Sequence, residues 1–261
     1  MRVCTLASSS SGNCAIVSHG GTHILIDAGI SLRRIRDGLR QVELTPDKLE
    51  CVLITHEHSD HIGGIGMLTK YHKTPVFCSG GASNGISSAY PDAGPFISAF
   101  EPGTSLALGA ITVTSFRTPH DASDSVGYII EAAGRKLIYV TDLGCVTQEV
   151  LDAVKGADAA VIEANHDREM LRNGSYPSFL KNRILSKKGH LSNDDSAHFA
   201  VLLAASGSRK ILLAHLSREN NTPERAGSTV ADTLRGNGFV TGKDIELDVA
   251  PPFSMSRVFE V

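Results

Sequence analysis

The feature that most constrains the fold of this chain is a cluster of metal-binding side chains directly after a short apolar run. Residues 51–54, Cys-Val-Leu-Ile, are typical of a buried strand, and His56, His58, Asp60 and His61 follow in the order H-x-H-x-D-H. A strand that ends here delivers all four side chains to one loop. Imidazole and carboxylate are ligands that Zn²⁺ and Mn²⁺ accept. A polar turn would explain one such histidine, but the whole pattern indicates a metal site.

Short apolar runs bounded by turn-forming residues recur along the chain, with amphipathic stretches between them. The apolar runs predict strands over residues 3–7, 15–18, 23–26, 52–54, 76–78, 105–108, 111–116, 126–131, 136–139, 159–162, 211–214, 245–248 and 256–260. The amphipathic stretches predict helices over residues 31–40, 62–71, 147–154, 194–205 and 223–236. This order favours an α/β fold of the αββα type, in which two mixed β-sheets pack face to face and helices cover both outer faces. Without an internal repeat or linker, residues 1–261 are expected to form a single domain.

Composition and charge argue against several classes of protein. The net charge is −3, so nucleic acid would have to be bound by a local basic patch. The five cysteines are odd in number and lack C-x-x-C spacing, which argues against a disulfide framework. There is no signal-peptide pattern and no apolar run long enough to span a membrane. We therefore expect a cytoplasmic protein that has no membrane role.

Three further residues lie where a predicted strand gives way to a loop: His120, Asp142 and His215. Loops at strand ends are where sheets commonly present functional residues. Each of the three alone would pass as a capping or surface residue. Two metal ions about 3.5 to 4 Å apart need more ligands than one cluster supplies, including one that bridges. Together with the cluster, these residues predict a two-metal site.

The combined pattern resembles the metallo-β-lactamase superfamily over nearly the whole chain. The resemblance implies the αββα fold and assigns His56, His58, His120 and Asp142 to one ion. It assigns the second ion to four residues that share the bridging aspartate: Asp60, His61, Asp142 and His215. Asp27, in Ile-Asp-Ala-Gly, matches a position that supports the metal loop without binding metal, and Asn13 is a second candidate for such support.

Three segments narrow the resemblance to the WalJ group of bacterial proteins, also called YycJ or VicX. These segments are Ser-Ser-Ser-Ser-Gly-Asn-Cys at 8–14, Ile-Glu-Ala-Asn-His-Asp at 162–167 and Gly-His-Leu-Ser at 189–192. The resemblance implies a 5'-to-3' exonuclease that acts on double-stranded DNA. Some members of the group are encoded beside an essential two-component regulator. An accessory role in such a signalling system is therefore one alternative function.

The ligand set indicates hydrolysis. Two divalent ions, Zn²⁺ or Mn²⁺, supply hydroxide at neutral pH and offset charge on a phosphoryl or acyl oxygen. Asp60 and Asp142 would hold the ions that carry this chemistry. The oxygen-reducing branch of the superfamily has Glu at the position of His58, which argues against a redox di-iron site. The leaving oxygen of a phosphodiester also needs a proton, and Glu163, His166 and His190 are the candidate donors. Structural pairing within a turn is the alternative for the first two, and a solvent-exposed loop position is the alternative for His190.

A basic stretch precedes His190. The stretch from Met170 to Asn193 contains two aromatic residues, Tyr176 and Phe179, and no acidic residue. Its five cations are Arg172, Lys181, Arg183, Lys187 and Lys188. Cations bind phosphates and aromatic rings stack on bases, so these residues are candidate DNA contacts. The alternative is a solvated helix face. A second basic set, Arg33, Arg34, Arg36 and Arg40, fits a solvated helix face better.

The hydroxyl-rich loop that contains Ser10 and Ser11 is a further candidate for a phosphate contact, or else an ordinary turn. Only about 70 residues separate Asp142 from His215, so the capping domain of the RNA-processing relatives is not expected. This favours DNA over RNA as the substrate. An alternative enzyme on the same site would hydrolyse a small-molecule thioester, lactone or β-lactam.

Overall fold

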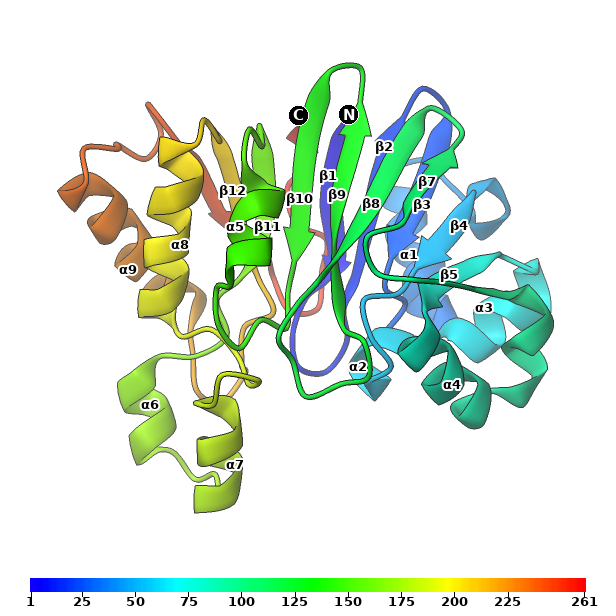
Figure 1. Ribbon diagram of the computed structural model, residues 1–261, viewed down its shortest axis with the longest axis horizontal. Coiled ribbons are helices and arrows are strands. Elements are labelled where there is room, and N and C mark those ends of the chain that lie inside the picture. The colour runs from blue at the N-terminus through cyan, green and yellow to red at the C-terminus, as the bar shows by residue number, and fades with distance from the viewer.

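Two seven-stranded β-sheets form the centre of the computed structural model, which describes residues 1–261 (Figure 1). The first sheet has the order β14-β1-β2-β3-β4-β5-β6. Its strands are β1 (Arg2–Ala7), β2 (Cys14–His19), β3 (Thr22–Ile26), β4 (Cys51–Leu53), β5 (Val76–Ser79), β6 (Ile97–Phe100) and β14 (Phe259–Glu260). The second sheet has the order β13-β12-β11-β10-β9-β8-β7. Its strands are β7 (Ser105–Leu108), β8 (Ile111–Arg117), β9 (Val126–Ala132), β10 (Arg135–Val140), β11 (Ala159–Glu163), β12 (Lys210–Ala214) and β13 (Glu246–Val249).

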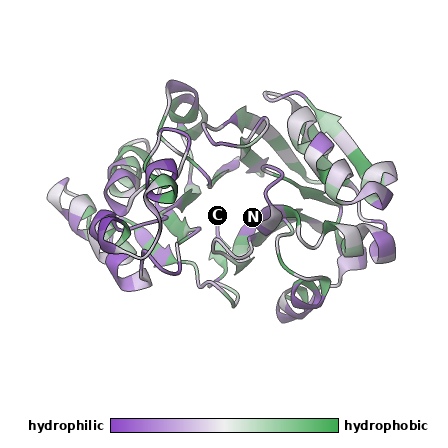
Figure 2. Ribbon diagram, turned by 90° about the horizontal axis from the view of Figure 1, so that it is seen from below, coloured by the Kyte–Doolittle hydropathy of each residue, from purple (hydrophilic) through white to green (hydrophobic).

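Helices cover the outer face of each sheet, as Figure 2 shows from below. The first sheet carries α1 (Leu32–Gln41), α3 (Ile65–His72) and α4 (Gly80–Ala89), with the one-turn helix α2 (Ser59–Ile62) at its lower edge. The second carries α5 (Gln148–Val154), α8 (Asn193–Ala205) and α9 (Pro223–Gly236). Two short helices, α6 (Arg168–Asn173) and α7 (Ser178–Ile184), project below this sheet in Figure 1. The predicted αββα architecture is confirmed.

Strand residues alternate between two apolar layers. Ile24 and Ile26 of β3 point into the core between the sheets, while Leu25 packs under the helices of the outer face. In β10, Leu137 lies in the core between the sheets and Ile138 faces α5 and α8. Since both faces of each central strand are buried, the strands appear in the sequence as continuous apolar runs.

Within each sheet, the strands that lead into the loops with the clustered histidines and aspartates run in the same direction. In the first sheet β3, β4 and β5 are parallel, and in the second β10, β11 and β12 are parallel. Strand β8 has the same direction as β10, because both are antiparallel to β9. The loops that follow these strands therefore meet at one edge, the lower edge in Figure 1.

The sequence missed the elements α2, α4, β6, α6 and α7 and misjudged two boundaries. Helix α4 is rich in glycine, a poor helix former, but the Ser79 side chain caps its first turn. The helix predicted over 62–71 corresponds to α3, which begins only at Ile65, and the separate turn α2 was not predicted. Gly63 and Gly64 separate the two helices. A Cβ on Gly64 would lie 2.3 Å from the Ile30 carbonyl oxygen, so the chain needs glycine at this close approach. The strand predicted over 256–260 is limited to Phe259–Glu260.

No helix has both the length and the apolar character to cross a lipid bilayer. The longest, α9, has 14 residues.

Candidate metal centre

The loop after β4 gathers the clustered histidines beneath the first sheet. The ring of His56 lies 4.5 Å from that of His58 and 4.1 Å from that of His61, measured between centroids. His56 and His61 are fully buried, because the loop is enclosed between the two sheet edges. The H-x-H-x-D-H pattern thus produces a convergent cluster, as the sequence predicts.

His120, three residues after the end of β8, completes a first group with His56 and His58. The three offer ligand atoms that all lie within 4.8 Å of one another. His120 Nε2 lies 3.3 Å from His58 Nδ1, and His120 Nδ1 lies 3.1 Å from the Gly189 carbonyl oxygen. A carbonyl can only accept, so Nδ1 carries the proton and the Nε2 lone pair faces the group.

Asp60, His61 and His215 form a second group of ligand atoms. Asp60 Oδ2 lies 3.4 Å from His61 Nε2 and 3.5 Å from His215 Nε2. Behind this group, Asp27 Oδ2 lies 2.8 Å from His61 Nδ1, and Asp27 Oδ1 accepts a hydrogen bond from the Thr55 amide at 2.9 Å. Asp27 therefore orients His61 from behind, in the supporting place that the resemblance assigns to it.

Asp142, two residues after the end of β10, lies between the two groups. Its Oδ2 is 3.3 Å from His61 Nε2, and its Oδ1 is 3.7 Å from His120 Nε2. A carboxylate so placed can offer one oxygen to each of two cations. The structure thus brings together all seven predicted ligands.

The donor set fits divalent metal. Buried polar atoms are normally hydrogen-bonded, yet His56 Nε2 and Asp142 Oδ2 are buried without a partner. Leaving such atoms unpaired costs free energy, and a cation between them would satisfy both. Histidines and aspartates alone make up the set, which matches the ligand preference of Zn²⁺ and Mn²⁺.

Three residues of the centre have a left-handed backbone. Asp27, Asp142 and His215 have φ angles of 59°, 56° and 57°, and each lies within two residues of the end of a strand. This region is disfavoured for residues other than glycine and costs of order 1 kcal/mol or more each. Strain of this kind accumulates at functional sites, which agrees with the ligand geometry.

The charges of the centre are strongly coupled. Burial lowers the pKa of His56, and the neighbouring imidazoles lower it further, so this ring is neutral and ready to bind metal. Burial also opposes a charge on His215, but the carboxylates of Asp142, Asp60 and Glu163 outweigh it and raise the pKa of His215 to about 10. In the absence of metal, a proton on His215 thus compensates the buried carboxylates.

Glu163, at the end of β11, orients two histidines. Its Oε1 lies 2.8 Å from Nδ1 of both His190 and His215. Its Oε2 accepts hydrogen bonds from the amides of Leu143 at 3.0 Å and Leu191 at 2.9 Å. The carboxylate is fully buried, and these partners hold its pKa below the usual range against the effect of burial. Glu163 is therefore an anionic positioning group, which argues against its candidacy as proton donor.

The other two candidate donors differ in position. His190 is partly exposed, and its ring lies 5.0 Å from that of His120 and 5.3 Å from that of His215. His166 is buried, neither ring nitrogen has a partner, and burial lowers its pKa to about 4. The structure thus brings His190 to the centre and leaves His166 outside both ligand groups.

The loop between β1 and β2 closes one side of the centre. Asn13 Nδ2 lies 3.3 Å from Asp60 Oδ2, and the amide group is fixed by hydrogen bonds with the backbone of Ser9. The structure thus places Asn13, a residue expected to support the centre, beside Asp60. Ser10 and Ser11 are exposed at the tip of the loop, with their hydroxyls free to meet solvent or substrate.

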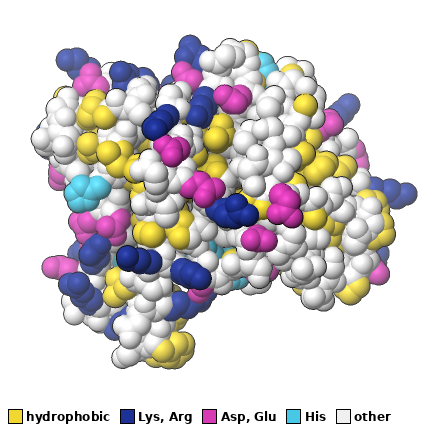
Figure 3. Space-filling model, viewed as in Figure 1, with side chains coloured by type: hydrophobic (Ala, Val, Ile, Leu, Met, Phe, Trp, Pro, Cys, Tyr) yellow, Lys and Arg dark blue, Asp and Glu magenta, His cyan; other side chains and the backbone are white.

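The five cations of the basic stretch have different environments in the structure. Arg183 of α7 pairs with Asp121, the residue after His120, and this pair ties α7 to the metal centre. Lys181 instead donates hydrogen bonds to the carbonyl oxygens of Arg172 and Gly174, which close the end of α6. Arg172, Lys187 and Lys188 are exposed. Figure 3 shows the dark blue cations over the projecting helices.

Sequence analysis did not identify Asp121 or Thr55 as parts of the centre. Thr55 donates its hydroxyl to Asp27 Oδ2 at 3.0 Å, and Asp121 holds Arg183. The only indication of their role in the sequence is their position, since each is next to a histidine of the proposed metal centre. A hydroxyl or carboxylate beside a ligand is too common to indicate a role by itself.

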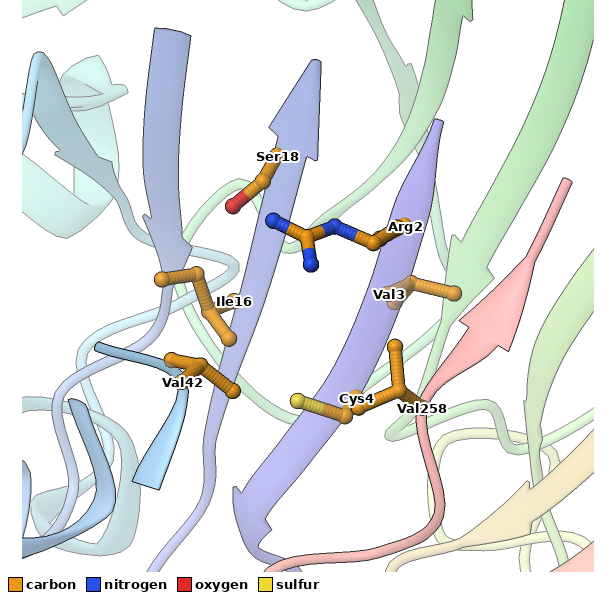
Figure 4. A pocket seen from close by; sticks show the side chains of 7 residues that line it. All are labelled: Arg2, Val3, Cys4, Ile16, Ser18, Val42 and Val258. Atoms are coloured by element: carbon orange, nitrogen blue, oxygen red, sulfur yellow. The ribbon is translucent and has the colours of Figure 1, made fainter. Parts of the chain in front are cut away.

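A small cavity of about 20 Å³ lies between β1, β2 and the end of α1, lined by the side chains of Figure 4. It has room for about one water molecule. None of its lining residues belongs to the ligand groups, so it is not a substrate site.

Comparison with known proteins agrees with the geometry. Residues 22–216 match the family described as Beta-lactamase superfamily domain. The chain is 38% identical over 256 residues to Exodeoxyribonuclease YycJ of Bacillus anthracis, covering 97% of this chain and 96% of the relative. It is 36% identical over 261 residues to Exodeoxyribonuclease WalJ of Streptococcus pneumoniae, covering 98% and 96%.

Solved structures share the fold at low identity. The metallo-β-lactamase fold protein YhfI from Bacillus subtilis matches with a TM-score of 0.72 and 17% identity, over 99% of each chain. Zinc-bound PqqB from Methylobacterium extorquens matches with a TM-score of 0.74 and 18% identity, over 100% of each chain.

Proposed function

This chain belongs to the metallo-β-lactamase superfamily, and on that basis we propose that it is a two-metal phosphodiesterase that removes nucleotides from DNA. The position of Asp142 between two groups of ligands carries the proposal for the chemistry. The full-length likeness to two exodeoxyribonucleases carries the proposal for the substrate.

His56, His58 and His120 would hold one ion, and Asp60, His61 and His215 the other. Asp142 would be shared by both ions, because its carboxylate lies near His120 and His61. Two divalent ions, Zn²⁺ or Mn²⁺, would supply a hydroxide nucleophile at neutral pH and offset charge on the phosphate. Asp27 and Glu163 keep His61 and His215 in the orientation that this binding needs.

His190 is the proton donor in this proposal. The Glu163 carboxylate accepts from His190 Nδ1, which fixes the orientation of the ring and leaves Nε2–H to face the substrate. Transfer of that proton to the leaving oxygen of the DNA avoids formation of an unstable alkoxide. Glu163 itself does not donate, since its pKa is held low by the two histidines.

Helix α7 provides a route for a DNA strand. Arg183 and Phe179 are four residues apart and therefore share one face of the helix. Arg183 is next to the metal centre through its pair with Asp121, and Phe179 lies one helical turn away from Arg183. Phe179 is 75% exposed, which is unusual for a large apolar side chain. A cation next to an aromatic ring suits a phosphate followed by a base. The 5'-to-3' direction and the preference for double strands come from the resemblance to the WalJ group and remain predictions.

Duplex DNA labelled at the 5' end tests the proposal. Protein loaded with Mn²⁺ or Zn²⁺ should release labelled mononucleotides and spare a closed circular duplex. Asp142→Asn should abolish the release, whereas the matched surface variant Asp152→Asn, on α5, should retain it. Metal analysis should find two ions per chain. Inert DNA alongside turnover of a thioester or lactone would instead support a small-molecule hydrolase.

A further inference from the structure

Two arginines near the metal centre lie against one aromatic ring. The guanidinium carbon of Arg218 is 4.8 Å from the ring centroid of Phe253, and that of Arg34 is 5.8 Å from the same centroid. Arg34 Nη2 also donates a hydrogen bond to the Phe253 carbonyl oxygen at 3.3 Å. The ring itself is 52% exposed. We refer to these three residues as the arginine platform.

Neither arginine of the platform forms an ion pair with a carboxylate. This distinguishes Arg34 from its neighbours on α1, since Arg33 and Arg40 both pair with Asp37. Stacking on a ring restrains a guanidinium while leaving most of its N–H donors free. Two such cations at one ring repel each other unless an anion lies between or beside them. The arrangement therefore suits a phosphate.

The platform adjoins the second group of metal ligands. Arg218 follows His215 by three residues, a span of about 11 Å at most between Cα atoms. The adjacent Leu216 pairs with Ser9 of the loop that holds Asn13 against Asp60. A pocket of about 200 Å³, lined in part by Leu216, Arg218 and Pro252, opens at this place.

The platform and helix α7 border the metal centre at different ligands. Arg218 follows His215 closely in the chain, whereas Arg183 pairs with Asp121, the residue after His120. The segment that carries α6 and α7 also contacts the residues that follow Arg218. Ser175, between these two helices, donates a hydrogen bond to Glu219 at 3.4 Å, and the Asp167 amide donates to the Asn220 carbonyl oxygen at 2.8 Å. The cations of α7 and of the platform therefore lie along one continuous rim beside the ligands.

We propose that Arg34 and Arg218, held on the ring of Phe253, bind backbone phosphates of the DNA beside the scissile bond, on the His215 side of the metal centre. This inference rests on the proposed function. The DNA would then be held at two places on the rim of the metal centre, by Arg183 of α7 near His120 and by the platform near His215. Such a two-point grip aligns the scissile phosphate without contributing to the chemical step.

Three variants test the platform: Arg34→Gln, Arg218→Gln and Phe253→Leu. Arg33→Gln is the matched control, because Arg33 lies on the same helix and pairs with Asp37. Each arginine variant should raise the KM for duplex DNA by about tenfold and reduce the slope of log affinity against log salt by about one. Phe253→Leu should raise KM by a smaller factor, since it releases the cations without removing them. The kcat for bis(4-nitrophenyl) phosphate should not change, and Arg33→Gln should resemble the wild type in every assay.

Unchanged KM and salt dependence in both arginine variants would overturn the platform. Wild-type protein that hydrolyses the small diester but leaves DNA intact would contradict the proposed function instead. In that case, anisotropy of a labelled, 5'-phosphorylated duplex still tests the platform. Equal affinity of the wild type and both arginine variants would then refute it, whereas weaker binding by Arg34→Gln and Arg218→Gln, with Arg33→Gln unchanged, would support it.

Discussion

His190 and His215 share a single carboxylate oxygen, since Oε1 of Glu163 lies 2.8 Å from Nδ1 of each ring. His215 offers its other nitrogen to the second group of ligands, while His190 faces the partly exposed side of the centre. One buried carboxylate thus connects a metal ligand with the proposed proton donor. Changes at Glu163 should affect both metal affinity and proton transfer.

Glu163→Gln keeps the shape of the side chain but removes its charge. We expect metal affinity at the second group to fall about 10- to 100-fold, because His215 loses its anionic partner. Saturating metal should restore occupancy but not the full kcat on DNA. Metal titration monitored by competition with a chromophoric chelator, followed by kcat at saturation, separates the two effects. Full recovery of kcat would mean that Glu163 only supports the metal.

His190→Ala removes the proposed proton donor and none of the seven proposed metal ligands. The kcat on DNA should fall about 10²- to 10⁴-fold, the usual contribution of general acid catalysis. Bis(4-nitrophenyl) phosphate has a leaving group that needs no proton, so its hydrolysis should be nearly unaffected. An equal loss on both substrates would point to a role for His190 in metal binding.

The role of Glu163 depends on strand register, which the sequence does not reveal. Glu163 pairs with Ala214 across β11 and β12, and this pairing places it beside His215. The ligands themselves could be predicted, because His56, Asp142 and His215 each follow an apolar run closely. The inter-sheet core could be predicted for the same reason, since buried strands are continuous in apolar residues.

Helices α6 and α7 could not be predicted, because six or seven residues are too few to show a helical period. Their stability comes from contacts distant in sequence. Asp167 caps α6 and also pairs with Arg225 of α9, and Arg183 of α7 pairs with Asp121. The pairing of Arg183 with Asp121 joins residues 62 positions apart. Similarly, the burial of His166 depends on packing that its local sequence does not indicate.

Removal of metal should make stability depend on pH. Within the metal-free centre the carboxylates raise the pKa of His215 to about 10 and that of His61 well above its usual value, although burial opposes both charges. A raised pKa in the folded state means stabilisation that is fully present below pH ~6.5 and lost as the pH rises toward 10. The Tm of protein in EDTA should therefore fall between pH 7 and 10.

Metal-loaded protein should lack this fall, because its histidines are neutral ligands, and metal binding at pH 7 should release protons. Calorimetric titration in buffers of different ionisation enthalpy measures that release. His215→Gln should reduce both effects, whereas His198→Gln, at an exposed position on α8, should change neither. Metal binding without proton release would contradict the assignment of charge to these imidazoles.

Phe179 should contribute to DNA binding and not to folding. Its side chain is 75% exposed, so Phe179→Ala should change the free energy of unfolding by less than about 0.5 kcal/mol. Loss of one base stack costs about 1–3 kcal/mol, which corresponds to a rise in KM of roughly 5- to 150-fold. Because a stacked ring contacts no phosphate, the salt dependence of binding should remain that of the wild type. Arg183→Gln should instead lower the salt dependence, and Leu185→Ala, at another exposed apolar position just after α7, is the matched control. If Phe179→Ala binds DNA as well as Leu185→Ala does, the strand does not pass along this face of α7.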